Sequence, residues 1–254
     1  MANKVINKKA QVTVFIIIAL LIIIAIVLVF VLFRQPRVEV SPSADPESYI
    51  EKCIEDYTKE AVDILAETGG DIEPEGTLMY NGEEIVYLCY TASFYQTCVN
   101  QRPLLIEHIE SEITNYIKPK IEECFSSLRG ELIEKGYSVD YEDLDVRTEL
   151  QTKKIVVTVD RQTTISKGDD VRKINSYKEG VNHPIYDLAE IAMEIVNQES
   201  RYCNFDILGF MIFYPNYDIQ KLDIEDGTIY IIKELTTDKE FKFAIRSCAL
   251  PAGF

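Results

Sequence analysis

Apolar residues are distributed along this chain in two different ways. Residues 14–33 form an unbroken run of 20 apolar residues that contains no charge, glycine or proline. A helix of that length spans about 30 Å, which is the thickness of the hydrocarbon core of a bilayer. The run therefore predicts one transmembrane helix over residues 11–33, whereas the later part of the chain mixes apolar and polar positions as a folded domain does.

Three later segments carry apolar residues at the helical spacing of three and four. The first begins at Asp45-Pro46, a capping residue followed by a proline that suits the first turn, and it ends at a Gly-Gly pair. The second runs over about residues 103–128, and Pro119 inside it is expected to kink or split the helix. The third covers about residues 184–198.

The remaining segments are rich in β-branched and aromatic residues, which predicts strands. Asn81-Gly82 between two of them is typical of a two-residue hairpin turn. The predicted strands are residues 77–80, 85–91, 137–141, 146–150, 155–160, 163–166, 207–214, 217–224, 228–234 and 241–246. Helices separated from runs of consecutive strands favour an α+β fold, with about three helices packed on an antiparallel sheet.

Proline marks the boundary between the apolar run and the folded part. Residues 34–46 contain three prolines and no apolar periodicity, which indicates an extended spacer. The chain is therefore expected to comprise a basic leader at 1–10, the transmembrane helix at 11–33, the spacer at 34–46 and an extracytoplasmic α+β domain at 47–254.

Charge is distributed unevenly between these parts. Residues 1–37 hold five basic and no acidic residues, which leaves 42 acidic against 21 basic residues in the remainder. A basic flank favours a cytoplasmic N-terminus, so we expect a single-pass protein of the cell membrane, held by membrane lipid, with its C-terminal domain extracellular. The apolar run is longer than the core of a secretory signal and is expected to stay on the protein. The acidic domain repels nucleic acid, and no nucleic-acid partner is expected.

The cysteines agree with an external domain. There are six, all after the apolar run: Cys53, Cys89, Cys98, Cys124, Cys203 and Cys248. An even number fits three disulfide bonds in an oxidising compartment, with buried free thiols as the alternative.

The positions of these cysteines favour one set of pairs. Cys53 and Cys124 lie on the apolar stripes of the first two predicted helices, so packing of these helices brings them together. Two further cysteines, 89 and 98, are close in sequence, and the last two, 203 and 248, bracket the C-terminal strands. The favoured pairs are 53–124, 89–98 and 203–248.

The residues Lys8-Lys9-Ala10-Gln11-Val12-Thr13-Val14-Phe15 resemble the class III signal peptides of archaeal type IV pilin-like proteins. In that family a prepilin-type peptidase removes a short basic leader that ends in Gly or Ala, and the hydrophobic helix stays on the mature protein. The resemblance implies a processing site between Ala10 and Gln11, with Lys8 and Lys9 in the leader. It also implies a prepilin-type peptidase as a partner and self-association through residues 11–33, because such helices form the core of a filament.

Two features depart from the family. Many pilins carry a glutamate at the fifth mature position, where this chain has Phe15. Pro36 and Pro42 also interrupt the continuous helix that commonly leads into a pilin head. The resemblance is confined to the leader and the apolar helix.

Two functions follow from these observations. The favoured one is a pilin-like, membrane-anchored cell-surface protein, a minor or tip subunit of a filament because its head is large. The alternative is a signal-anchored extracellular binding module, a receptor or adhesin that is not assembled into a filament.

Candidate chemistry beyond anchoring is sparse. No catalytic, phosphate-binding or dinucleotide-binding motif is present, so no enzymatic activity and no cofactor are expected. His108 is interpreted as a solvated or edge-of-face residue of the second helix, and His183 as a capping or loop residue. Acidic clusters near residues 140–145, 169–170 and 223–226 do not fit a calcium-binding loop, and no metal site is assigned.

Tyrosine is the one residue type that suggests a binding surface. Of 15 tyrosines, Tyr87, Tyr90 and Tyr95 gather around Cys89 and Cys98. Tyrosine is enriched at interfaces, so an exposed cluster would favour the binding module. The favoured interpretation is that these rings pack half-buried over a sheet.

Overall fold

The computed structural model describes residue 22 and residues 45–250. The chain divides into two compact units, 1–40 and 41–254. Within the described residues, no helix is long and apolar enough to cross a membrane. The predicted transmembrane helix at 11–33 lies outside them, apart from Ile22, and remains a prediction.

Helix α2 (Pro46–Thr68) opens the domain as the capping pattern predicts. Asp45 is its N-cap residue, although its side chain makes no capping hydrogen bond, and proline occupies the first turn. Gly69 ends the helix at φ 90°, a left-handed conformation that glycine adopts without strain. The predicted start and end of this helix are confirmed.

Strands β1 (Thr77–Tyr80) and β2 (Glu83–Tyr90) form the predicted hairpin. Tyr80 pairs with Glu83, so Asn81 and Gly82 are the two turn residues, and both have positive φ, 52° and 88°. These angles are what a primed two-residue turn requires. A short strand, β3 (Val99–Asn100), pairs with the end of β2.

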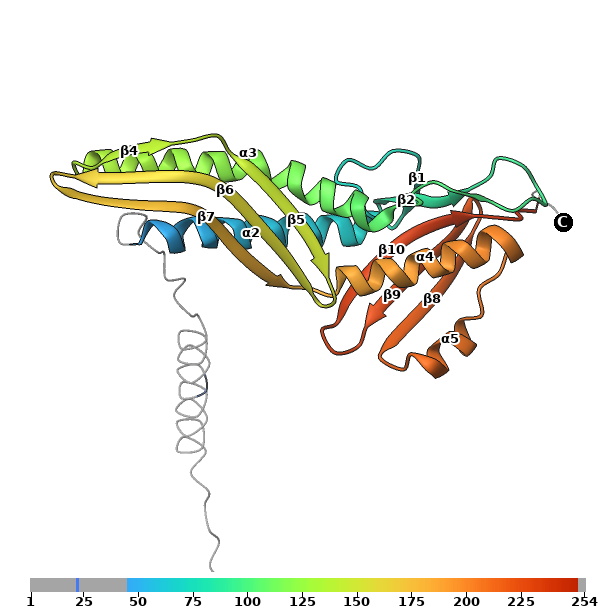
Figure 1. Cartoon of the computed structure of the whole chain (residues 1–254). Helices are drawn as coiled ribbons and strands as arrows, with labels where there is room; N and C mark the ends of the chain where they lie inside the picture. The colour runs from blue at the N-terminus through green and yellow to red at the C-terminus, as the bar shows by residue number, and fades with distance from the viewer. Residues whose placement is uncertain (1–21, 23–44, 251–254) are drawn as a thin grey trace, which may run out of the picture. The chain divides into compact units, whose positions relative to one another are not determined.

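Helix α3 (Leu105–Glu134) is longer than predicted and is not split at Pro119. Its buried stripe of apolar residues continues through the proline, so packing outweighs the loss of one backbone hydrogen bond. Helices α2 and α3 lie side by side (Figure 1) and are joined by the disulfide Cys53–Cys124, with Cα atoms 6.6 Å apart.

Four strands form one antiparallel sheet: β4 (Ser138–Tyr141), β5 (Asp145–Gln151), β6 (Lys154–Lys167) and β7 (Asp170–Asn182). The two strands predicted at 155–160 and 163–166 are one strand, β6, with an irregularity between Asp160 and Thr163. Strand β7 was not predicted, because most of its side chains are exposed and polar and it lacks a clear apolar alternation. β6 lies at the centre, paired with all three neighbours.

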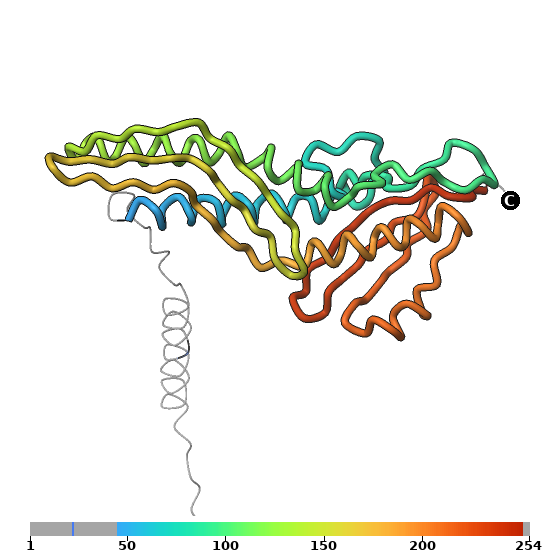
Figure 2. The backbone as a smooth tube through the Cα atoms, viewed as in Figure 1, coloured from blue at the N-terminus to red at the C-terminus, as the bar shows by residue number. Residues whose placement is uncertain are grey.

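Helix α4 (Ile185–Tyr202) and the last strands complete the fold. Strands β8 (Tyr217–Ile224), β9 (Gly227–Glu234) and β10 (Lys239–Arg246) extend a second sheet in the order β1-β2-β10-β9-β8. β10 pairs with β2 in parallel, so the expectation of a purely antiparallel sheet is wrong. Figure 2 shows how the C-terminal segment comes to lie beside the much earlier β2.

The predicted strand at 207–214 is instead the short helix α5 (Ile207–Phe213). Its apolar run has no clear period, and such short runs suit a strand or a helix equally well. Asp206 decides locally in favour of the helix, because its carboxylate accepts a hydrogen bond from the Gly209 amide at 3.0 Å. The described domain is therefore α+β with four helices and two sheets, in place of three helices on one sheet.

The main core lies between the helices and one face of each sheet. Its largest fully buried side chains include Phe125, Tyr177, Tyr230, Phe241 and Phe243. A smaller cluster of Leu78, Ile85, Ile229 and Ala244 forms separately. The core positions α2, α4 and the ends of β2 and β10, and these elements carry the two candidate sites.

Candidate functional site

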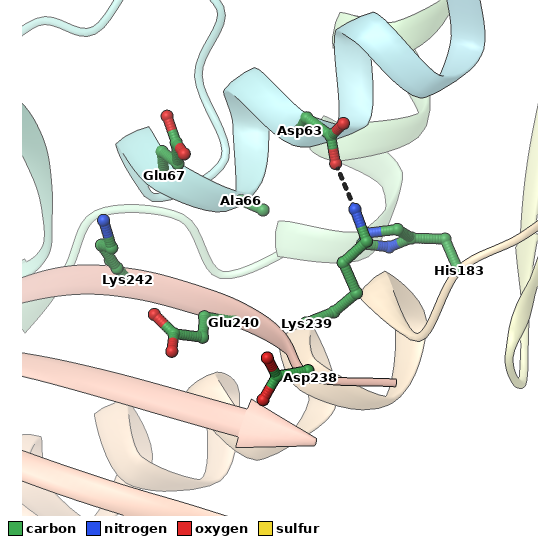
Figure 3. Close-up of a pocket in the computed structure, with 8 residues that line it drawn as sticks. All are labelled: Asp63, Ala66, Glu67, His183, Asp238, Lys239, Glu240 and Lys242. Atoms are coloured by element: carbon green, nitrogen blue, oxygen red, sulfur yellow. Dashed lines mark hydrogen bonds and ion pairs between the residues drawn. The ribbon is translucent and has the colours of Figure 1, made fainter. Parts of the chain in front are cut away.

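A polar cavity of about 370 Å³ opens between α2 and the β9–β10 hairpin (Figure 3). Its lining is mostly charged and consists of Asp63, Ala66, Glu67, His183, Asp238, Lys239, Glu240 and Lys242. Asp63 of α2 accepts a hydrogen bond from Lys239 Nζ at 2.6 Å, which ties the helix to the hairpin across the cavity. The lining holds no hydroxyl or thiol, so it offers no side-chain nucleophile of that kind for catalysis.

His183 is the most deeply buried polar residue of this cavity lining. Its Nδ1 accepts a hydrogen bond from the Ile185 amide at 3.1 Å, so the neutral ring carries its proton on Nε2. The pKa of His183 is lowered to about 4, chiefly by burial and also by the nearby Lys239, while Asp63 opposes the shift. His183 lies in the loop before α4, whose N-cap residue is Pro184, so the prediction of a capping or loop residue is confirmed as a loop residue whose side chain bonds to the first helical amide. The ring is neutral at pH 7.

A second candidate site is an aromatic surface at the end of β2. The disulfide Cys89–Cys98, with Cα atoms 5.4 Å apart, closes the loop between β2 and β3. Arg246, the last residue of β10, pairs with Tyr90 in the parallel register. Its guanidinium lies 5.8 Å from the Tyr90 ring centre and 5.4 Å from that of Phe94, within the range of cation–π attraction. Arg246 also donates a hydrogen bond to the Thr91 carbonyl.

The C-terminal segment holds this loop from the other side. Cys248 donates its amide hydrogen to the Gln96 carbonyl at 2.7 Å, and the Tyr95 amide donates to the Ala249 carbonyl at 3.0 Å. The disulfide Cys203–Cys248 fixes the same segment to the end of α4, with Cα atoms 5.8 Å apart. Two disulfides and a set of backbone hydrogen bonds therefore hold the loop, the C-terminal segment and the α4 end as one unit (Figure 1).

We call this unit the aromatic end, defined by the exposed side chains Tyr90, Phe94, Tyr95, Val99, Tyr202 and Leu250. Tyr95 is 59% exposed and Tyr202 is 72% exposed, so their rings face solvent and do not pack over the sheet. Of the tyrosine cluster predicted from the sequence, Tyr90 and Tyr95 are therefore exposed. Tyr87 is half-buried and donates its hydroxyl hydrogen to the Asp226 carbonyl at 2.9 Å.

The sequence carried a further indication of this surface that the prediction did not use. Residues 85–101 contain no charged side chain, in a chain of which 27% of the residues are charged. An uncharged, aromatic and amide-rich loop that two disulfides hold rigid has the composition of a recognition surface, because its side chains lose little freedom on binding. What this arrangement can do chemically is bind, by stacking and hydrogen bonding.

Three buried carboxylates, Asp71, Glu199 and Glu234, were not foreseen. Asp71 lies 2.5 Å from His108 Nε2 and 2.8 Å from Arg102 Nη2. Burial alone would raise the pKa of Asp71, but hydrogen bonds from His108 and Arg102 outweigh it and hold that pKa below its usual range. His108 is thus an edge residue of α3, as predicted, with an ionic partner that the sequence did not reveal.

The second buried carboxylate, Glu199, supports the aromatic end. It lies on the buried stripe of α4 and accepts hydrogen bonds from the Tyr230 hydroxyl and, at 3.2 Å, from Lys221 Nζ. Its backbone carbonyl accepts one from Ser247 Oγ at 3.0 Å, next to Cys248. The sequence did contain a signal for a buried carboxylate here, because Glu199 follows Val196 by three residues and so continues the apolar stripe of the helix.

The other predicted site residues are those of the processing site and the six cysteines. Lys8, Lys9, Ala10 and Gln11 of the processing site lie outside the described residues. The six cysteines form the three disulfides 53–124, 89–98 and 203–248, the set that the sequence favours. Over residues 45–250, no three His, Cys, Asp or Glu side chains are grouped so that they could hold a metal ion.

Comparison of this chain with protein-family models, with curated proteins and with solved structures found no match.

Proposed function

We propose that this chain is a pilin-like, membrane-anchored cell-surface protein that displays its disulfide-bonded domain outside the membrane. The observation that carries the proposal is that all six cysteines are paired within one domain. Disulfides form and persist in oxidising compartments, and a domain placed there needs a route across the membrane. The apolar run at 14–33 behind Lys8 and Lys9 supplies that route and an anchor.

The aromatic end supplies a binding surface on this displayed domain. Minor or tip subunits of surface filaments and free-standing adhesins both present a binding surface, and an exposed, rigid aromatic loop supports either. The alternative function, a signal-anchored binding module outside any filament, is favoured by the same loop. The two differ in whether residues 11–33 drive assembly.

Processing tests the pilin-like proposal directly. Mature protein isolated from membranes of its native host is expected to begin at Gln11, which mass spectrometry of the N-terminal peptide will show. Ala10→Phe should block this cleavage, because a prepilin-type peptidase requires a small residue there, and should leave membrane insertion intact. Ala2→Phe is the matched control and should be processed normally. Native protein that retains Met1 or Ala2 would leave the plain signal-anchor as the better description.

Attachment tests the role of the aromatic end. The variant Phe94→Ser/Tyr95→Ser is expected to reduce attachment of cells that display the protein by about tenfold, the loss typical of removing an aromatic hot spot. The amount of protein on the surface should not change, because both side chains are exposed. Leu235→Ser, an exposed apolar residue between β9 and β10, is the control. Equal attachment by all three proteins would remove the binding role from this surface.

A further inference from the structure

Three large apolar side chains of α5 are exposed to solvent. Leu208 is 73% exposed, Ile212 is 77% and Phe213 is 80%. Leu208 and Ile212 are one helical turn apart on the outer face, and Phe213 is exposed at the C-terminal end of the helix. We call these three exposed side chains the α5 ridge. None of its members is buried by the described part of the chain.

The side chains of the α5 ridge are exposed although α5 itself is packed against the domain. Phe210, on the inner side, lies 5.5 Å from the ring of the buried Phe205 and 4.5 Å from the ring of Tyr214. Phe205 in turn contacts Tyr230 of the main core. Asp206 caps the first turn through the Gly209 amide. The helix is therefore held to the domain while its ridge points away from it.

The chemistry around the ridge is that of a membrane interface. Residues 207–217 contain no charged side chain, although the domain as a whole is strongly acidic. Tyr214, which is 53% exposed, follows the ridge directly, and tyrosine is enriched at the level of lipid headgroups. A short segment with exposed apolar residues and an exposed tyrosine beside them suits shallow insertion at the headgroup–acyl boundary.

The spacer limits how far the domain can leave the membrane. Residues 34–45 between the apolar run and α2 number 12, and even fully extended they reach only about 40 Å. A protruding ridge fits a fluid bilayer without a preformed groove. The cavity beside α2 of a second copy would not receive the ridge, because that cavity is lined mostly by charged residues.

We propose that the α5 ridge inserts into the outer boundary of the membrane in which residues 11–33 anchor the chain. This inference rests on the proposed membrane anchoring. It gives the protein a second membrane contact, made by the folded domain itself, with zwitterionic lipid as the binding partner.

A single tryptophan reports on this contact, because the chain contains no tryptophan of its own. The full chain carrying Phe213→Trp is reconstituted into phosphatidylcholine vesicles, with or without bromine on the acyl chains. Contact with the acyl chains is expected to lower tryptophan emission by about twofold or more in the brominated vesicles, since insertion brings the ring to the acyl boundary. Leu235→Trp is the matched control, exposed on the β9–β10 hairpin beside charged residues, and its emission should not change.

The other outcomes are distinct. A Phe213→Trp chain that floats with the vesicles but whose emission is not quenched by bromine overturns the α5 contact and leaves the anchor intact. If the introduced tryptophan is also shielded from aqueous acrylamide, a second copy or another protein covers the ridge in place of lipid. A chain that does not float with the vesicles overturns the anchor and, with it, the contact.

Discussion

Replacing Cys53 and Cys124 together by alanine is expected to lower the free energy of unfolding by about 4 kcal/mol. The bond closes a loop with a sequence separation of 71 residues. Its removal restores the conformational entropy of that loop to the unfolded chain, and the estimate follows from the loop length. The pair also joins α2 to α3, whose facing stripes form much of the main core. Urea unfolding of the detergent-solubilised chain, followed by tyrosine circular dichroism, measures the loss.

The disulfide Cys89–Cys98, at the end of β2, is the control for this prediction. Cys89 and Cys98 are separated by only 9 residues, so Cys89→Ala/Cys98→Ala should cost about 3 kcal/mol by the same reasoning. The two variants should therefore rank by loop length. A larger loss from the short loop would show that native contacts of the aromatic end, and not chain entropy, dominate the effect.

Acidification from pH 7 to pH 4 is expected to remove about 3 kcal/mol of stability through His183 alone. The pKa of His183 is lowered to about 4 in the folded protein, from 6.5 in the unfolded chain. Between these two values the unfolded chain takes up a proton that the folded protein does not, so stability falls as pH falls. The loss begins near pH 6.5 and levels off below about pH 4. It arises because the buried ring cannot be charged without cost.

Comparison with His183→Asn isolates this contribution. Asparagine can still accept the hydrogen bond from the Ile185 amide, but it does not titrate. The difference in unfolding free energy between the two proteins should shift by about 3 kcal/mol between pH 7 and pH 4, in favour of the variant at low pH. Asp71 contributes separately and at lower pH, because its folded pKa is depressed and its stabilisation is lost only as that carboxylate is protonated. A difference that does not vary with pH would mean that the folded protein accommodates a charged His183.

Local chemistry determined much of this fold from the sequence alone. The Asp45-Pro46 start and Gly69 end of α2, the Asn81-Gly82 turn and the three disulfide pairs were all readable from the chain. The helix ends and the turn depend on neighbours along the sequence, so a few residues carry the whole signal. The disulfide pairs followed from two helical stripes, from closeness in sequence and from the strands that the last two cysteines bracket. The apolar run at 14–33 is of the same kind and leads to the proposed anchor.

Tertiary structure decided what depends on residues far apart. The parallel pairing of β2 with β10 joins strands more than 150 residues apart, and no local pattern encodes it. α5 became a helix because Asp206 caps it and Phe210 packs on Phe205, although its apolar run suits a strand as well. The exposure of the aromatic end and of the α5 ridge was likewise fixed by packing, since a sequence of apolar residues does not say which of them the core will leave in solvent.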